Sequence, residues 1–395
     1  IMGVFFCDLF CRKCDMEVIS DRGERIMKKN ILFISNYPLP YRVEFFNQLG
    51  AVDEINLTVI FLENPSQQTH RSKDWFNTDY SFFQAVFLTK KISLGGKRVI
   101  HPELLSWVKK PFDEIIFGGY SYPSFMWAME FLKRNKRPFS MEADGGLISE
   151  DSTIKYKIKS HFLSMPSKWY SSGRVTSEYL THYGADASKI VTYPFSSLCQ
   201  KDLMKKEDLA KKKEESRALL GFSSDQRIAL NIGQFIHRKG VDVLLKAIAK
   251  VDPEILFLIV GGKPTEEYQE IIEKEKISNV KFLDFMPKDK LSYYYDAADF
   301  FVCPTREDIW GLVINEAMAH GLPTISTDRC GAGVELIEDG QSGFVVKTGD
   351  VDALAQAIQK ISKMDLRAMG EKALERVQGY TIEEMVKVHI RSFMS

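Results

Sequence analysis

The sequence predicts an α/β protein made of two doubly wound domains that face each other across a cleft. The chain has 395 residues, which is more than one hydrophobic core usually serves. Short apolar runs alternate with amphipathic stretches in both halves, the pattern of parallel sheets covered by helices. A stretch rich in Lys, Glu and Asp, 201–220, separates the halves. We therefore expect one sheet on each side of that stretch.

The first domain is expected over 28–200. Its strands are predicted from short apolar runs bounded by turn residues, at 31–35, 57–62, 81–88, 114–117, 138–142, 169–171 and 190–193. Helical periodicity between them predicts helices at 42–49, 102–110, 124–135 and 176–183.

We interpret 201–220 as the domain linker, although its charged composition is also typical of a solvated helix. The second domain is expected over 221–375, with strands at 228–232, 255–260, 280–283, 300–303, 324–327 and 344–346. Its helices are expected at 241–250, 266–276, 288–297, 313–319 and 351–360. Within 376–395, an amphipathic helix at about 382–393 is expected to pack back on the first domain.

Residues 1–27 are expected to lie outside the fold, because Met27 is followed at once by polar residues and the first strand. Cys7, Cys11 and Cys14 have the spacing with which radical S-adenosylmethionine enzymes hold an iron–sulfur cluster. That motif belongs after the first strand of a barrel, and almost nothing precedes it here, so we reject this interpretation.

Composition limits the classes of partner. Apolar residues make up 45%, charged residues 27%, and the formal net charge is zero, which is ordinary globular composition. No apolar run is long enough to span a bilayer, so we expect a cytoplasmic protein. The sequence contains no nucleic-acid-binding module, so nucleic acid is not expected as a partner. Two basic clusters are typical of a solvated face and are also compatible with peripheral contact with an anionic membrane at its inner face: Lys90, Lys91, Lys97, Arg98, Lys109, Lys110, and Lys133, Arg134, Lys136, Arg137.

The first motif with a chemical meaning follows the strand 228–232. Gly233 and Gln234 end that strand, and Arg238 and Lys239 precede Gly240 and a helix. Glycine lets the backbone approach a ligand, and a helix N-terminus with two cations favours an anion such as a diphosphate. A basic pair in a surface turn is equally compatible with simple solvation.

The second motif runs from Asp308 through Gly311, Leu312 and Val313 to Glu316, directly after the strand 300–303. Loops at the carboxyl ends of parallel strands build ligand sites beside a topological switch. Glu316, in the first turns of a helix, could accept hydrogen bonds from ribose hydroxyls. The alternative is that Glu316 only stabilises the helix dipole.

These residues resemble the hallmark of the retaining glycosyltransferases of family 4, also called group 1, over about 226–360. Asp308 and Glu316 flank seven residues, and Ala317-Met318-Ala319, Gly321-Leu322-Pro323 and Thr327-Asp328 follow in the family's order. The resemblance implies the GT-B fold, with an acceptor domain followed by a nucleotide-sugar donor domain. It implies that Arg238 and Lys239 contact the donor diphosphate, Glu316 the ribose, and Asp308 the transferred sugar, while Gly311, Leu312 and Val313 pass close to the phosphate and ribose.

The chain departs from the family pattern in two places. Asp308 replaces the usual Glu, and Gln234 stands where many members have a phosphate-binding Arg, which leaves Arg238 to supply that charge. In the first domain, Tyr41 and Arg42 fall in a loop similar to the family's acceptor-side loop, without its usual glycine pair. Asp144, before two glycines, could orient a sugar hydroxyl or could be a turn residue.

The resemblance therefore implies a hexosyltransferase-type enzyme with Asp308, Arg238 and Lys239 as its catalytic residues. Its partners would be a nucleotide-sugar donor and a sugar or lipid-linked sugar acceptor, in polysaccharide, lipopolysaccharide or glycolipid biosynthesis. The alternatives are a nucleotide-sugar-binding protein or an epimerase without transfer, or an interaction module that binds no donor. No cofactor or metal is expected, because Asp350-Val351-Asp352 is explained as a helix N-cap rather than a metal-binding Asp-x-Asp.

Overall fold

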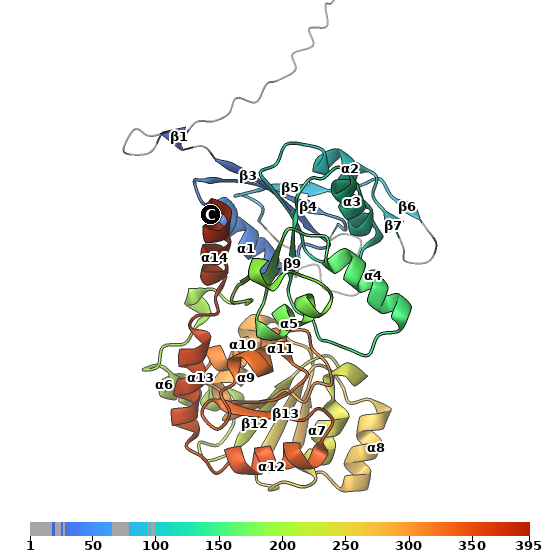
Figure 1. The fold of residues 1–395 in the computed structure, drawn as a ribbon. Helices are drawn as coiled ribbons and strands as arrows, with labels where there is room; N and C mark the ends of the chain where they lie inside the picture. The colour runs from blue at the N-terminus through green and yellow to red at the C-terminus, as the bar shows by residue number, and fades with distance from the viewer. Residues whose placement is uncertain (1–17, 20–24, 27, 65–78, 94, 96–98) are drawn as a thin grey trace, which may run out of the picture.

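The computed structural model describes residues 18–19, 25–26, 28–64, 79–93, 95 and 99–395 (Figure 1). Cys7, Cys11 and Cys14 lie outside the described residues, as do Lys97 and Arg98. Within 1–27, the strands β1 (Val18–Ile19) and β2 (Arg25–Ile26) form an antiparallel pair. Across the described parts of the chain, no helix combines the length and apolar character needed to cross a membrane.

The first domain is built on a seven-stranded parallel sheet in the order β11-β10-β9-β8-β3-β4-β5. The strands are β3 (Lys29–Ser35), β4 (Ile55–Phe61), β5 (Gln84–Phe87), β8 (Glu114–Phe117), β9 (Ser140–Ala143), β10 (Lys168–Ser171) and β11 (Ile190–Thr192). The helices are α1 (Pro40–Gly50), α2 (Glu103–Val108), α3 (Pro123–Arg134), α4 (Thr153–Leu163) and α5 (Arg174–His182). Each predicted strand is present, whereas α4 and a small ribbon of β6 (Ile92–Ser93) and β7 (Val99–Ile100) were not predicted.

Strand β3, which has a neighbouring strand on each side, shows why this sheet forms. Ile31 pairs with Leu57 of β4 on one side and with Glu114 of β8 on the other. Residues 31–34 are fully buried, as expected of a parallel strand covered on both faces. The strand ends before Pro40, which occupies the first position of α1, where its missing N–H is not needed.

The second domain has a six-stranded parallel sheet in the order β14-β13-β12-β15-β16-β17. The strands are β12 (Ile228–Ile232), β13 (Leu256–Val260), β14 (Val280–Leu283), β15 (Phe300–Val302), β16 (Thr324–Thr327) and β17 (Gly343–Val346). The helices are α7 (Val241–Ile248), α8 (Glu266–Glu275), α9 (Lys288–Ala297), α10 (Leu312–Ala319), α11 (Gly331–Leu336), α12 (Val351–Ile361) and α13 (Leu366–Val377). The chain moves outward from β12 to β14 and returns to its other side at β15, so the switch point lies between β12 and β15.

The charged stretch between the halves is helical from residue 209. Helix α6 (Leu209–Leu220) is anchored to the second domain by Arg217, whose Nε donates to the Ala297 carbonyl at 2.9 Å and whose Nη2 lies 2.9 Å from Asp299. Its other face is solvated, and Leu219 there is 65% exposed. The stretch interpreted as a linker therefore includes a helix that belongs to the second domain.

The final helix, α14 (Ile382–Met394), crosses back to the first domain, where Figure 1 shows the C-terminus beside α1. The ring of His389 stacks on Tyr170 of β10 with centroids 4.7 Å apart. The Tyr170 hydroxyl also lies 3.0 Å from Ser392 Oγ. The chain thus ties its last helix into the core of its first sheet.

Candidate active site

Three of the predicted residues meet at the switch point of the second sheet. Lys239 Nζ lies 2.5 Å from Asp308 Oδ2, and Arg238 Nη1 lies 3.5 Å from Asp308 Oδ1. Arg238 Nη1 also donates to the Glu307 carbonyl at 2.8 Å. Asp308 is buried while the Arg238 side chain is 45% exposed. The two loops after β12 and β15 therefore form one charged cluster that remains open to solvent on the Arg238 side.

Local geometry explains how these loops come together. Gly240 has φ +68°, and a Cβ there would lie 2.2 Å from the Pro304 carbonyl oxygen. Arg306, in the loop after β15, donates two hydrogen bonds to Asp242 at the start of α7, at 2.7 and 2.6 Å, and so joins the two loops. Across the cluster, the Lys239 side chain lies over Gly233, because a Cβ on that glycine would approach it to 3.7 Å. Close contact between the loops thus requires glycine at 240.

The predicted donor-side backbone follows directly. Gly311 has φ +99° and is the N-cap of α10, a conformation that favours glycine. The first amides of a helix have no partner within it, so Leu312 and Val313 present N–H groups at its positive end. Gln234, in the loop after β12, is exposed. These groups are suited to an anionic ligand held beside Lys239.

Glu316 lies further along α10 and faces a different cavity. Its Oε2 accepts a hydrogen bond from the Tyr295 hydroxyl at 2.9 Å. Burial raises the pKa of Glu316, and the Tyr295 hydrogen bond opposes that rise. The surrounding cavity, of about 450 Å³, is lined by Leu198, Lys288 and Ser292 among others. Tyr295 and Lys288 of α9 were not predicted, because no short motif marks them.

Arg238, Lys239 and Asp308 are absent from the described residues that line this cavity. Helix α10 links the two places: from Gly311 to Glu316 it advances about 7–8 Å along its axis. That spacing is comparable with the separation of a diphosphate from the far side of its ribose. The predicted donor residues are thus divided between two adjoining places rather than gathered in one pocket.

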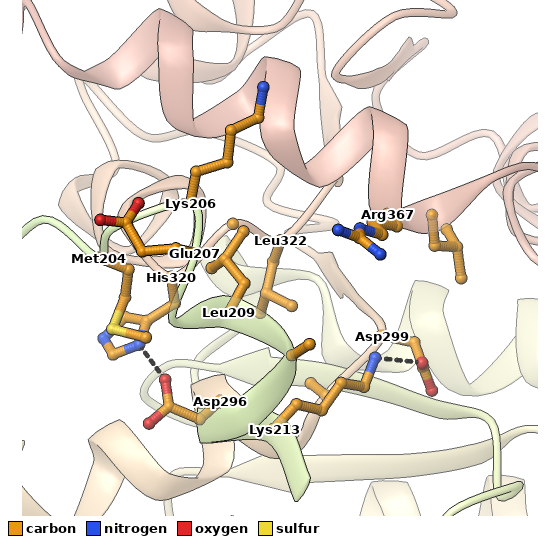
Figure 2. Close-up of a pocket in the computed structure, with 14 residues that line it drawn as sticks. Met204, Lys206, Glu207, Leu209, Lys213, Asp296, Asp299, His320, Leu322 and Arg367 are labelled. Carbon is orange, nitrogen blue, oxygen red and sulfur yellow. Dashed lines mark hydrogen bonds and ion pairs between the residues drawn. The ribbon is translucent and has the colours of Figure 1, made fainter.

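A second cavity, of about 220 Å³, lies beyond His320, which lines both cavities (Figure 2). Figure 2 shows two pairs of its charged groups, His320 with Asp296 at 2.6 Å and Lys213 with Asp299 at 2.6 Å. The His320 ring also stacks on Tyr295 at 5.0 Å. Two ion pairs therefore line this cavity. Its wall includes His320, which packs against Tyr295, the residue that donates a hydrogen bond to Glu316.

The structure corrects the expectation for Arg42. Its guanidinium is buried, donates to Glu142 at 2.6 and 3.1 Å, and lies 5.1–5.2 Å from the ring centres of Phe33, Phe45 and Phe46. Although burial opposes ionisation, Arg42 lowers the pKa of Glu142 below its usual value. A group closed in by these partners cannot contact an acceptor directly.

Asp144 is the half-buried member of this group. Its Oδ1 accepts a hydrogen bond from the Tyr193 hydroxyl at 3.0 Å and lies 3.5 Å from Arg42 Nη1. Burial raises the pKa of Asp144 to about 6, with Arg42 opposing the rise. Tyr41, also predicted on this side, is half-buried and packs edge-on against Phe195 at 5.8 Å. Arg42 is therefore linked to the loop at the domain boundary through its ion pair with Asp144.

His389 of α14 completes the buried cluster and was not predicted. Its Nδ1 lies 2.8 Å from the Met385 carbonyl oxygen, and its Nε2 lies 3.8 Å from Glu142 Oε2. Burial lowers the pKa of His389. The periodicity of this segment predicted only an amphipathic helix, without a sign of which residue would reach the first domain.

The loops that carry Asp144 and Asp308 touch each other across the domain boundary. A Cβ on Gly145 would lie 2.3 Å from the Ile309 carbonyl oxygen. Arg329 donates to the Ile148 carbonyl at 3.0 Å and pairs with Glu307 at 3.2 Å. The two predicted carboxylates thus belong to loops that meet, and Arg329 is a further residue of this boundary that sequence reasoning missed.

The helix N-cap interpretation of Asp350 is confirmed. Its Oδ1 accepts a hydrogen bond from the Ala353 amide at 2.9 Å, at the start of α12. Asp352 points to Lys250, with Nζ 2.6 Å from its carboxylate. The two aspartates therefore serve separate structural contacts.

Two facing parallel sheets, each with the chain reversing about its first strand, define the GT-B fold of glycosyltransferases. The structure of Anabaena HepE in complex with UDP shows the same fold, with a TM-score of 0.71 at 17% identity over 93% of this chain and 100% of that one. Residues 212–376 match the model of the family "Glycosyl transferases group 1".

Curated proteins that are similar to this chain also carry glycosyltransferase names. The D-inositol 3-phosphate glycosyltransferase of Corynebacterium kroppenstedtii is 32% identical over 51% of this chain and 47% of its own length. The lipopolysaccharide core biosynthesis glycosyltransferase LpsE of Rhizobium meliloti is 30% identical over 37% of this chain and 42% of its own length. The chain spans about half the length of the curated relatives it matches.

Proposed function

We propose that this protein transfers a hexose from a nucleotide-diphosphate sugar to an acceptor hydroxyl with retention of anomeric configuration. The observation that carries the proposal is the Arg238–Lys239–Asp308 cluster at the switch point, with Glu316 about 7–8 Å further along α10. A diphosphate requires cations and helix amides, and a ribose requires a hydrogen-bond acceptor at roughly that distance. The match of residues 212–376 to the group 1 glycosyltransferase model and the UDP bound to the structural neighbour support the same donor class.

The chemistry assigned to the residues follows from their charges. Lys239, Arg238 and the first amides of α10 would stabilise the negative charge that grows on the leaving diphosphate, and such electrostatic stabilisation often contributes more to catalysis than any other effect. The diphosphate would take over the cations that now pair with Asp308, and this would turn that carboxylate toward the sugar. The bond from the anomeric carbon to the diphosphate breaks, and the bond to the acceptor oxygen forms on the same face. The acceptor proton passes to the departing phosphate oxygen.

The acceptor would enter from the first domain, beside Asp144. We propose a sugar or lipid-linked sugar acceptor in polysaccharide, lipopolysaccharide or glycolipid biosynthesis, handled in the cytoplasm at the inner face of a membrane. The name of the Rhizobium meliloti relative supports this class. No metal and no other cofactor is part of the proposal.

The experiment is a panel of UDP-, GDP- and dTDP-sugars incubated with the purified protein without acceptor, with release of the nucleoside diphosphate measured. We expect slow hydrolysis of one donor, absent from K239A. Conversion of the donor to its epimer without release would instead indicate an epimerase. Donor binding by calorimetry without release or conversion, even after a panel of sugar acceptors is added, would indicate a binding protein. Absence of binding to every donor would overturn the proposed site.

A further inference from the structure

Helix α4 is the least covered helix of the first domain. Of its eleven residues, all of which the structure describes, Leu163 at the C-terminal end is the buried one. Ile154 is 74% exposed and Ile158 is 46% exposed. These two side chains are four residues apart and so lie on one face of the helix. The contacts of α4 with the core come from Phe162 and Leu163 at its C-terminal end, so the aliphatic ridge of Ile154 and Ile158 takes no part in packing the domain.

The charge of α4 is of a single sign. Its sequence contains Lys155, Lys157, Lys159 and His161 but neither Asp nor Glu. At about 100° per residue, Lys155 and Lys157 lie about 80° to either side of the line through Ile154 and Ile158. Lys157 is exposed, and Lys155 is 60% exposed although it pairs with Asp151 at 2.8 Å. Cations therefore flank the aliphatic ridge on both sides.

The neighbouring helix α3 extends the same character. His161 of α4 lies 2.6 Å from Glu130 of α3, which joins the two helices. One turn away on α3, Trp127 is 40% exposed, and Arg134 is 80% exposed. The end of α3 carries the basic cluster at 133–137 that is visible in the sequence. Glu130 pairs both with Arg134 of that cluster and with His161, so the cluster lies beside α4, whose exposed isoleucines the sequence did not reveal.

The position of α4 relates it to the candidate active site. The helix begins five residues after Ile148, whose carbonyl accepts a hydrogen bond from Arg329 of the second domain. Figure 1 shows α4 on the outside of the first domain, at the end that faces the second domain. A surface on which α4 rested would therefore lie near the loops that carry Asp144 and Asp308.

We propose that Ile154, Lys155, Lys157 and Ile158, here called the α4 surface, dock on a lipid bilayer that contains anionic lipids. The isoleucines would enter the region between headgroups and acyl chains while the lysines contact the headgroup phosphates, the arrangement of interfacial amphipathic helices. A membrane fits better than an acidic protein, because the ridge projects as two aliphatic side chains rather than forming a pocket for aromatic anchors. A lipid-linked acceptor, as in the proposed function, would then meet the protein where it is embedded, although docking itself does not depend on catalysis.

The test is co-sedimentation of the full chain with vesicles of phosphatidylcholine alone and of phosphatidylcholine with one quarter phosphatidylglycerol. We expect binding to the anionic vesicles that weakens with salt, and a loss of about tenfold or more in the variant I154S/I158S. The variant K157E should also lose binding. The matched control is L219S, which removes an equally exposed aliphatic side chain from the lysine-rich helix α6 of the second domain and should bind as the parent does.

Equal binding of I154S/I158S and the parent, or absence of binding to anionic vesicles, would overturn the proposal. Each variant is first checked by its melting temperature, and its donor hydrolysis is measured without vesicles. Vesicle binding that follows the α4 surface in a protein without donor hydrolysis would leave the docking proposal standing while the proposed function fails. Donor hydrolysis without vesicle binding would overturn the docking proposal and leave the proposed function standing.

Discussion

Each domain places a cation–carboxylate pair near the ends of its central strands, and the two pairs differ in their surroundings. Lys239–Asp308 lies between two loops beside the half-exposed Arg238. Arg42–Glu142 is enclosed by three phenylalanine rings and lies next to His389. A pair that water can reach can exchange one partner for a ligand, whereas separating a buried pair leaves an uncompensated charge in the core. Similar residues therefore indicate a binding site in one domain and a structural support in the other.

The largest effect expected from this comparison is on stability. Glu142→Gln keeps the shape of the side chain but removes the charge that compensates the buried Arg42, so the free energy of unfolding should fall by about 3–5 kcal/mol. Urea unfolding followed by circular dichroism measures it. Asp308→Asn is the comparison, because Arg238, one of its two cationic partners, is 45% exposed and can turn to water, and we therefore expect a smaller loss than for Glu142→Gln. Similar losses in the two variants would remove the distinction between the pairs.

The next effect is on catalysis. Lys239→Ala should lower turnover by about 10²–10³-fold, because one preorganised charge no longer stabilises the leaving diphosphate. Steady-state release of the nucleoside diphosphate measures it, and the melting temperature should change little. Lys250→Ala, which removes a solvent-exposed lysine paired with Asp352, should leave turnover unchanged. A full rate in K239A would show that the Lys239–Asp308 pair is no more functional than the Arg42–Glu142 pair.

The fold was predictable from the sequence because apolar runs of parallel strands are local signals. All the principal strands of both sheets, such as β8 (Glu114–Phe117), were predicted to within a few residues. Helix α4 was not predicted because Ile154 and Ile158 face outward and its core contacts come from the adjacent Phe162 and Leu163, so the periodicity that indicates burial is weak there. A solvated helix within 201–220 was considered beside the linker, but its packing against the second domain was not predicted, because the anchoring Arg217 is one cation among many.

The site was predictable in part for the same reason. Asp308, Arg238 and Lys239 fall directly after strands whose ends must be neighbours, so the topology brings them together. Arg42 was misplaced because nothing local distinguishes a buried arginine from an exposed one; its partner Glu142 is 100 residues away. Tyr295 and His389 support the carboxylates from other elements, and such contacts arise only when those elements pack.

The next largest expected effect is on the affinity for the donor. Glu316→Ala removes the proposed acceptor of the ribose hydrogen bonds, and loss of a hydrogen bond to a charged group, about 1.5–3 kcal/mol, corresponds to roughly 10- to 150-fold weaker donor binding. Calorimetry with the donor found in the panel measures it. Glu273→Ala, an exposed carboxylate on α8, is the control and should bind normally. Unchanged affinity in E316A would separate the Glu316 cavity from the donor site.

Asp144 should give the acceptor side a pH dependence that the donor side lacks. Its pKa is about 6 in the folded protein, so below that pH it becomes neutral and accepts hydrogen bonds less well. Transfer to acceptor should fall by about tenfold per pH unit below 6, whereas donor hydrolysis should not follow this step. Because the pKa is raised on folding, stability should change in the opposite direction and increase as pH falls from 6 toward 4. Asp144→Asn should abolish the step in transfer, and a step that persists in this variant would assign it to another group.

The smallest effect concerns the support of Glu316. Tyr295→Phe keeps the ring stacked on His320 but removes the hydroxyl that donates to Glu316, and one such hydrogen bond corresponds to about a two- to tenfold change in donor affinity. That hydrogen bond also lowers the pKa of Glu316, so its removal should raise the pKa further. Donor affinity in Y295F should therefore begin to fall at a higher pH than in the parent as the solution is acidified. A purely structural role for Tyr295 would weaken binding equally at every pH, and this difference decides whether α9 positions the carboxylate or only packs against it.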